Sequence, residues 1–152
     1  MIAKSISNKS NQFFLDSSFV IALMDAADVF HKKAQKINET ILLDNQIFIS
    51  DVVINEVLSV FAKRCESKKK KSHFAKLTET FQKALETIPI LCLYELLPTQ
   101  YNKIISLMVK TQGTLNFHDA LIVLFLKEIP DVTLVSFDKD FQTIEELKLI
   151  LT

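Results

Sequence analysis

Short apolar runs alternate along the chain with longer segments in which apolar residues recur at the period of a helix. The runs typical of buried strands span residues 12–16, 47–50, 90–93, 132–136 and 149–151. The segments that predict helices span residues 18–25, 29–43, 52–65, 74–85, 101–110 and 117–126. Because near-continuously apolar strands alternating with helices are typical of parallel sheets, the pattern predicts an α/β domain with a central parallel sheet of four to five strands flanked by helices.

The composition is that of one globular domain. Of the 152 residues, 49% are hydrophobic and 24% are charged, which suffices for a core without disulfides or a structural metal. Residues 1–11 are polar, so we expect a short extension there and a single domain over residues 12–152. The extension has no apolar signal segment, and no apolar run approaches the ~20 residues that span a bilayer. We therefore expect a cytoplasmic protein that makes no membrane contact.

Charge, glycine and cysteine usage exclude several classes of protein. The 18 basic and 18 acidic residues cancel, so binding through a general basic field is not expected. Arg64 is the single Arg, which leaves little capacity for bidentate reading of guanine or phosphate. Gly113 is the single Gly, so a Gly-rich phosphate loop is excluded. Cys65 and Cys92 lack metal-site or redox spacing and are expected to be buried free thiols.

Four carboxylates fall where the predicted fold would gather a ligand site. Asp16 and Asp138 follow the first and fourth strands, and ligands bind at the carboxyl ends of parallel strands. Glu56 and Asp119 lie on apolar helical stripes that should face the core, where an unpaired carboxylate costs on the order of several kcal/mol. We therefore expect these four acids to converge and to hold a cation between them.

Structural explanations also exist for most of these acids. Asp16 and Asp138 could be helix N-caps, and Asp119 could complete a capping box with the residue three positions before it. Glu56 has no such explanation, because neither a cap position nor a Lys four residues away accounts for it. Asp51, which follows the second strand, is interpreted as a structural residue at the start of its helix.

The ligand types indicate the chemistry of such a site. Carboxylates without His or Cys suit Mg²⁺ or Mn²⁺ rather than Zn²⁺. One or two such ions can activate water for attack on phosphorus. The hydroxyls of Ser17, Ser18 and Ser136 stand beside the acids and could orient them. The three histidines form no Ser/His/Asp arrangement, and His118 is expected at the surface because it points away from its neighbour Asp119.

The four acids lie in the segments LDSSFVIAL, ISDVVINEVL, FHDALIVLFL and LVSFDKDF. Together, in order and spacing, these segments resemble the PIN domain, the fold of VapC-type toxin ribonucleases, from about residue 13 to residue 151. The resemblance implies a three-layer sandwich and an endoribonuclease that uses Mg²⁺ or Mn²⁺. The catalytic, metal-binding acids that it implies are Asp16, Glu56, Asp119 and Asp138. The supporting polar residues are Ser17, Ser18, Asp140 and Ser136, the last standing where Thr is usual.

The resemblance also implies what the protein binds. It implies RNA as the substrate, a cognate antitoxin and assembly as a homodimer. The motifs fit equally a toxin of a toxin–antitoxin pair and a PIN-like RNA-processing or RNA-binding module without an antitoxin. A receiver-like phosphotransfer domain is the alternative from another class, but the third strand ends LCLYELL, without the phosphoacceptor Asp that such a domain needs.

The segment KRCESKKKK, residues 63–71, lies at the tip of a predicted helical hairpin. Cations near a helix C-terminus are common on solvated surfaces. In the functional interpretation, Lys68, Lys69, Lys70 and Lys71 bind RNA phosphates. The sequence is compatible with both interpretations.

Overall fold

Five parallel strands form one sheet within residues 11–67 and 71–151, the part of the chain that the computed structural model describes. They are β1 (Gln12–Leu15), β2 (Gln46–Ser50), β3 (Ile90–Leu91), β4 (Val132–Ser136) and β5 (Leu149–Leu151). Their order is β3-β2-β1-β4-β5, so β1 and β4 lie side by side in the middle, with Leu15 opposite Val135. The register brings the carboxyl ends of β1 and β4 together.

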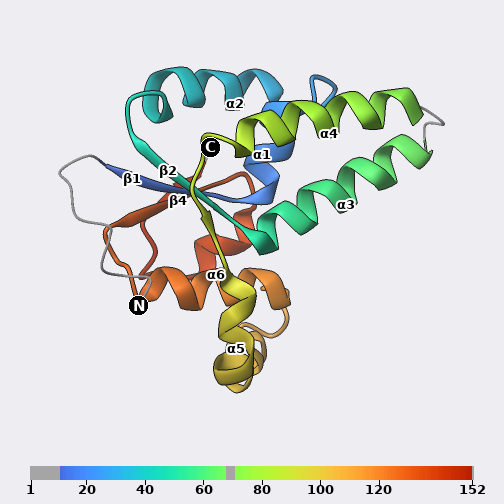
Figure 1. Cartoon of the computed structure of the whole chain (residues 1–152). Coiled ribbons are helices and arrows are strands. Elements are labelled where there is room, and N and C mark those ends of the chain that lie inside the picture. Colours follow the sequence, from blue (N-terminus) through green and yellow to red (C-terminus); the bar gives the residue numbers. More distant parts are fainter. Residues whose placement is uncertain (1–10, 68–70, 152) are drawn as a thin grey trace.

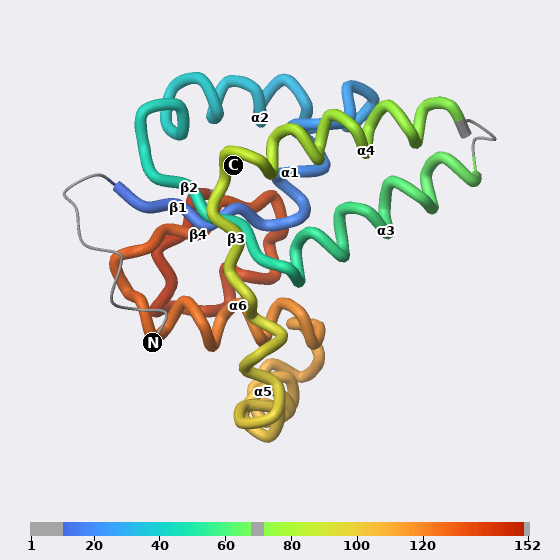
Figure 2. Tube along the Cα trace, in the orientation of Figure 1, coloured from blue at the N-terminus to red at the C-terminus, as the bar shows by residue number. Residues whose placement is uncertain are grey.

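Helices cover both faces of this sheet (Figures 1 and 2). They are α1 (Ser17–Met24), α2 (His31–Ile37), α3 (Asp51–Ser67), α4 (Lys71–Leu85), α5 (Leu97–Lys110) and α6 (Phe117–Lys127). The first four lie on one face, and α5 and α6 lie on the other, as right-handed crossovers require when the strand order reverses after β3. The predicted α/β three-layer sandwich with a central parallel sheet is confirmed.

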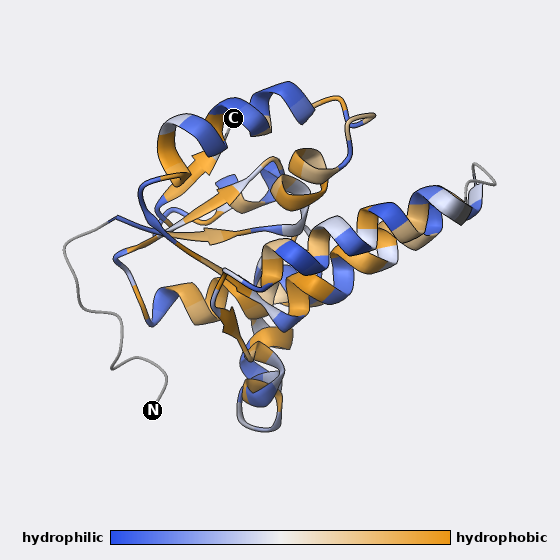
Figure 3. Ribbon diagram, turned by 45° about the horizontal axis from the view of Figure 1, so that its top comes forward, coloured by the Kyte–Doolittle hydropathy of each residue, from blue (hydrophilic) through white to orange (hydrophobic). Residues whose placement is uncertain are grey.

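The hydrophobic pattern explains which surfaces are buried. In Figure 3 the central strands are mostly hydrophobic, whereas α3 and α4 alternate between hydrophobic and hydrophilic sides. These two helices pack together as a hairpin that projects beyond the sheet (Figure 1). Phe14 on β1 and Leu134 on β4 are fully buried because both faces of the sheet are covered.

Three local expectations need correction. The helix predicted over 29–43 begins at His31 and passes at Asn38 into a short π-helical turn, Asn38–Leu42. Helix α5 begins before 101, the predicted start, because Pro98 is accepted in its first turn, where an N–H donor is not needed. The strand predicted over 90–93 ends at Leu91, and a 3₁₀ turn, Leu93–Leu96, leads into α5.

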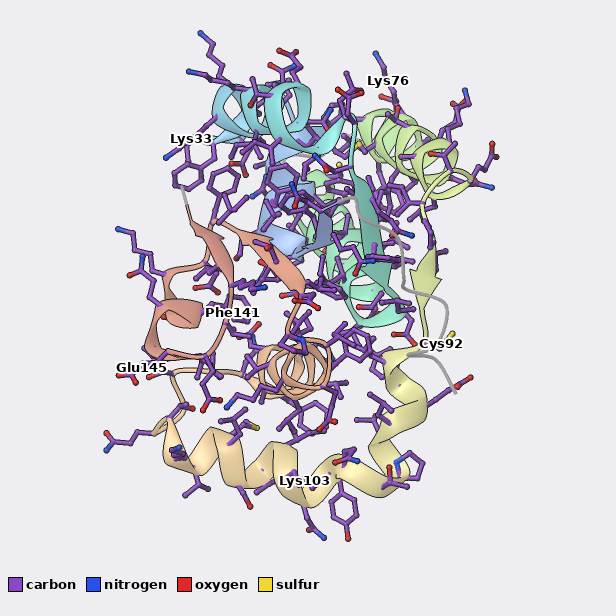
Figure 4. The ribbon with its side chains drawn as sticks, turned by 90° about the vertical axis from the view of Figure 1, so that its left-hand side faces the viewer. Lys33, Lys76, Cys92, Lys103, Phe141 and Glu145 are labelled. Atoms are coloured by element: carbon purple, nitrogen blue, oxygen red, sulfur yellow. The ribbon has the colours of Figure 1, made fainter. Side chains whose placement is uncertain are left out.

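The two cysteines differ. Cys65 is buried as expected, but Cys92 is exposed, so the expectation of a buried thiol was wrong there. The physical reason is that Cys92 follows β3, a two-residue strand at the edge of the sheet (Figure 4). Within the described residues, no helix combines the length and apolar content needed to cross a membrane.

Candidate active site

Asp16 is held at the junction between β1 and α1. Its backbone is extended and its carboxylate caps α1, accepting a hydrogen bond from the Ser18 backbone N–H at 3.2 Å. The hydroxyls of Ser18 and Ser136 also donate to Oδ2, at 2.5 and 2.8 Å. The side chain is buried, with the residue only 2% exposed. The sheet register thus joins two serines far apart in sequence to one carboxylate.

These two serines also fix the end of β4. Their hydroxyl oxygens lie 3.1 Å apart. Ser18 Oγ accepts from the Phe137 N–H, and Ser136 Oγ accepts from the Asp138 N–H, both at 2.9 Å. The start of α1 and the segment after β4 are therefore tied together around Asp16.

Asp119 and Asp138 are caps as well. Asp119 accepts from the Asn116 N–H at 3.1 Å and donates its own N–H to the Asn116 side chain at 3.0 Å, which completes a capping box on α6. Asp138 caps the 3₁₀ turn η4 (Lys139–Thr143) by accepting from the Asp140 N–H at 2.9 Å. The capping explanation is thus confirmed for Asp16, Asp119 and Asp138. The capping hydrogen bonds fix the orientation of these three carboxylates.

Glu56 is held differently. It projects from α3 and is half-buried, and its Oε2 atom is buried without a hydrogen-bond partner among the described residues. Burial raises the pKa of Glu56, and hydrogen bonding by the Ser17 side chain opposes this rise. The negative charges of Asp16 and Asp138 raise the pKa further, while the charge of His118 lowers it. Glu56 therefore lies within electrostatic reach of the other acids.

The structure brings all four predicted acids to one cleft of about 460 Å³, together with Ser17 and Ser18. Burial raises the pKa of Asp16, and the hydrogen bonds from Ser18 and Ser136 oppose it. Burial, with repulsion from the other three acids, raises the pKa of Asp119 to about 7, against the opposing Asn116 backbone hydrogen bond. The catalytic and metal-binding roles of these residues stay predictions.

The chemistry of the donors fits a hard divalent cation. All four side chains offer carboxylate oxygens, one of them the unpartnered Glu56 Oε2, and their mutual repulsion would be relieved by a positive charge. Within the described residues, no three His, Cys, Asp or Glu side chains are already spaced to hold a metal ion. The cleft therefore suits a divalent cation by the type of its ligands and by its negative charge.

Other predicted residues lie elsewhere. Asp140 is exposed and outside the lining of the cleft, where it acts on Asp138 only through its backbone N–H. Lys68–Lys70 lie outside the described residues, and of the predicted lysines only Lys71 is placed, at the start of α4. Their RNA-binding role stays a prediction.

The structure also tests the expectations for Asp51 and His118. Asp51 is structural, as expected: its carboxylate accepts from the Leu93 and Tyr94 N–H groups at 2.9 and 3.2 Å, which ties the turn after β3 to α3. His118 is half-buried, with Nε2 3.3 Å from the Tyr94 hydroxyl, so it lies only partly at the surface.

The sequence did not point to several other residues that line the cleft. Arg64 lines it together with Asp28, Val29 and Phe30. The guanidinium is paired with Asp25 at 2.8 Å and with Asp28 at 2.9 Å. The one available signal was that Arg64 is the single Arg of the chain.

Burial of Asp119, together with repulsion from the other acids, predicts a loss of stability as the pH rises in EDTA. The pKa of Asp119 is about 7 in the native state and near 3.8 when unfolded, so the native state binds more protons between these values. Stability from this group is full below about pH 4 and declines as the pH rises through about 7. We expect Asp119→Asn, which keeps a capping oxygen, to remove roughly 2 kcal/mol of the loss between about pH 5 and about pH 8. Urea unfolding at both pH values measures it, and equal losses in the two proteins would contradict the prediction.

Comparisons with known proteins agree with this architecture. The PIN domain family model matches residues 13–147. VapC20 of Mycobacterium tuberculosis, described as a Sarcin-Ricin loop cleaving toxin, superposes with a TM-score of 0.68 at 19% identity, over 90% of this chain and 98% of that chain. VapBC2 of Rickettsia felis, solved with a DNA fragment from its promoter, gives 0.63 at 20% identity, over 93% and 98%. PAE2754 of Pyrobaculum aerophilum gives 0.60 at 18% identity, over 90% and 80%.

No curated protein matches the chain. At these identities the solved structures show a shared fold, whereas the family model covers nearly the whole chain. The receiver-like alternative is thereby set aside. By its fold, and by the match over residues 13–147, the chain belongs to the PIN domain family.

Proposed function

We propose that this protein is a metal-dependent endoribonuclease and the toxin of a toxin–antitoxin pair. The observation that carries the proposal is the gathering of four carboxylates around one cleft, with Glu56 Oε2 buried and unpartnered. Such a cluster is costly for folding alone, because buried like charges repel one another. Binding of a cation and a phosphodiester at this site would explain why the chain gathers these acids despite the cost.

In the proposed reaction, water attacks phosphorus, one P–O ester bond breaks, and the leaving oxygen takes up a proton. Asp16, Glu56, Asp119 and Asp138 would hold Mg²⁺ or Mn²⁺, which would supply Lewis-acid stabilisation of the phosphate charge and lower the pKa of water. Ser18 and Ser136 keep the Asp16 carboxylate oriented through their hydrogen bonds to Oδ2. Glu56 Oε2, which has no partner in the described structure, is available to accept a hydrogen bond from the attacking water.

The toxin assignment is supported by the structural neighbours. One is described as a Sarcin-Ricin loop cleaving toxin, and others are VapBC or toxin–antitoxin complexes from Salmonella typhimurium and Klebsiella pneumoniae. The proposal accordingly includes a cognate antitoxin, a homodimeric assembly and action on cellular RNA in the cytoplasm. An RNA-processing enzyme without an antitoxin would share the cleft and the chemistry, and it would differ in having no inhibitory partner.

The direct test is to incubate the purified protein with a mixed RNA pool in Mg²⁺, Mn²⁺ or EDTA. We expect internal cleavage with either metal and none in EDTA, read by gel electrophoresis and by sequencing of the new ends. Asp119→Asn, prepared in the same way, controls for contaminating nucleases. Cleavage that is equal in EDTA, or equal in the variant, would contradict the proposal.

A further inference from the structure

Three phenylalanine rings form a stack that runs from the core to the rim of the acidic cleft. Phe19 is fully buried, Phe137 is 8% exposed and Phe30 is 41% exposed. The Phe19 and Phe137 centroids lie 5.8 Å apart with planes at 22°, and the Phe137 and Phe30 centroids lie 4.7 Å apart with planes at 8°. Phe30 is therefore a nearly parallel outer ring supported from behind by two others.

The loop that carries Phe30 is held in place by charged hydrogen bonds. Asp25 accepts from the Ala27 N–H and Asp28 accepts from the Phe30 N–H, both at 3.0 Å. The Arg64 guanidinium then bridges the same two carboxylates from α3. Because charge-assisted bonds of this kind are the strong ones, the ring is positioned before any ligand arrives.

The position of the ring suits a nucleic acid. Phe30 and Phe137 line the same cleft as the four acids. Lys32 and Lys33 follow in the first turn of α2 and are exposed, and Figure 4 shows the Lys33 side chain extending from the outside of that helix. An exposed aromatic ring beside cations is the arrangement by which proteins bind single strands, through base stacking and phosphate contacts.

We propose that Phe30 is a stacking platform for an unpaired nucleobase of the RNA, next to the phosphate that enters the acidic cleft. This inference rests on the proposed ribonuclease function and deepens it, because it names the substrate as single-stranded at that nucleotide. Stacking tolerates any base, so the platform positions the strand without selecting its sequence. Phe30 is thus a binding residue, and the carboxylates remain the candidates for the chemistry.

The test measures binding of a short, mixed-sequence single-stranded RNA in Mg²⁺, by fluorescence anisotropy, with all variants in a Glu56→Gln background to suppress cleavage. We expect Phe30→Ala and Phe30→Leu to weaken binding roughly 5- to 100-fold, the range for the loss of one stacked base. Phe30→Tyr keeps the ring and should bind as Phe30 does. The matched control is Tyr101→Ala, which removes a 50% exposed aromatic on α5, outside the cleft, and should change nothing.

Salt dependence separates stacking from charge. Phe30→Ala should lower the affinity at every salt concentration while leaving the slope of log K against log salt unchanged, because no phosphate contact is lost. A fully paired RNA duplex should bind Phe30 and Phe30→Ala proteins alike. The proposal would be overturned if Phe30→Ala changed the slope of log K against log salt, or if it lost as much affinity for the duplex as for the single strand.

The remaining outcomes are distinguishable. If the protein without these substitutions cleaves RNA, but Phe30→Ala and Phe30→Leu bind like the parent, the platform is refuted and the ribonuclease function stands. If the Phe30 variants lose only a protein partner and keep RNA affinity, the ring is a protein contact and the platform is again refuted. If the protein neither binds nor cleaves RNA, the proposed function fails and the platform fails with it.

Discussion

Glu56→Gln is expected to lower metal-dependent RNA cleavage roughly 100-fold or more, without loss of stability. The substitution removes a negative charge and the proton-accepting capacity of Oε2 while keeping nearly the same volume. The carboxylate it replaces is half-buried, repelled by Asp16 and Asp138, and has a buried oxygen without a partner. Folding therefore gains nothing from the charge, and the free energy of unfolding in EDTA should stay level or rise.

The measurement pairs initial cleavage rates in Mg²⁺ with urea unfolding in EDTA. Glu66→Gln is the matched control, because Glu66 lies on the same helix α3 and is exposed. That control should leave both quantities unchanged. A clear loss of stability with activity intact would show instead that Glu56 is a structural residue.

Saturating Mn²⁺ or Mg²⁺ is expected to raise the melting temperature by roughly 5–10 °C. A ligand at about 100 times its Kd stabilises the native state by about 2.7 kcal/mol, and each kcal/mol shifts a domain of this size by about 2–4 °C. Burial together with repulsion among the carboxylates raises the pKa of Glu56 and of Asp119, and the stabilisation arises because the cation offsets that repulsion. It should grow between about pH 6 and about pH 8, as Asp119 loses its proton.

Thermal unfolding with and without metal measures this effect, with NaCl added to the metal-free sample to match ionic strength. Asp119→Asn should gain less from the metal, because one ligand charge is gone. Equal melting temperatures with and without metal in the unsubstituted protein would show that the four acids do not form a shared cation site.

Much of the fold follows from local patterns that the sequence displays directly. Strands β4 and β5 begin and end at the predicted residues, each directly after a charged residue, Asp131 or Lys148. The four acids stood out because they interrupt apolar stripes or follow strands, and the structure places all four at one cleft. Capping geometry was also visible locally, since it depends on residues two or three positions apart.

What the sequence by itself determined is therefore the order of the elements, the parallel sheet and the identity of the acids. Only the tertiary structure decided that Ser18 meets Ser136 beside Asp16, and that Arg64 bridges Asp25 and Asp28. These contacts join residues 118, 39 and 36 positions apart, and they depend on which strands pair and which helices pack. Hydrophobic periodicity specifies which side of an element is buried but not which element covers it. For that reason the stack of phenylalanine rings that ends at Phe30 could not be predicted from the sequence. It depends on the pairing of β1 with β4 and on the packing of α1 against α3.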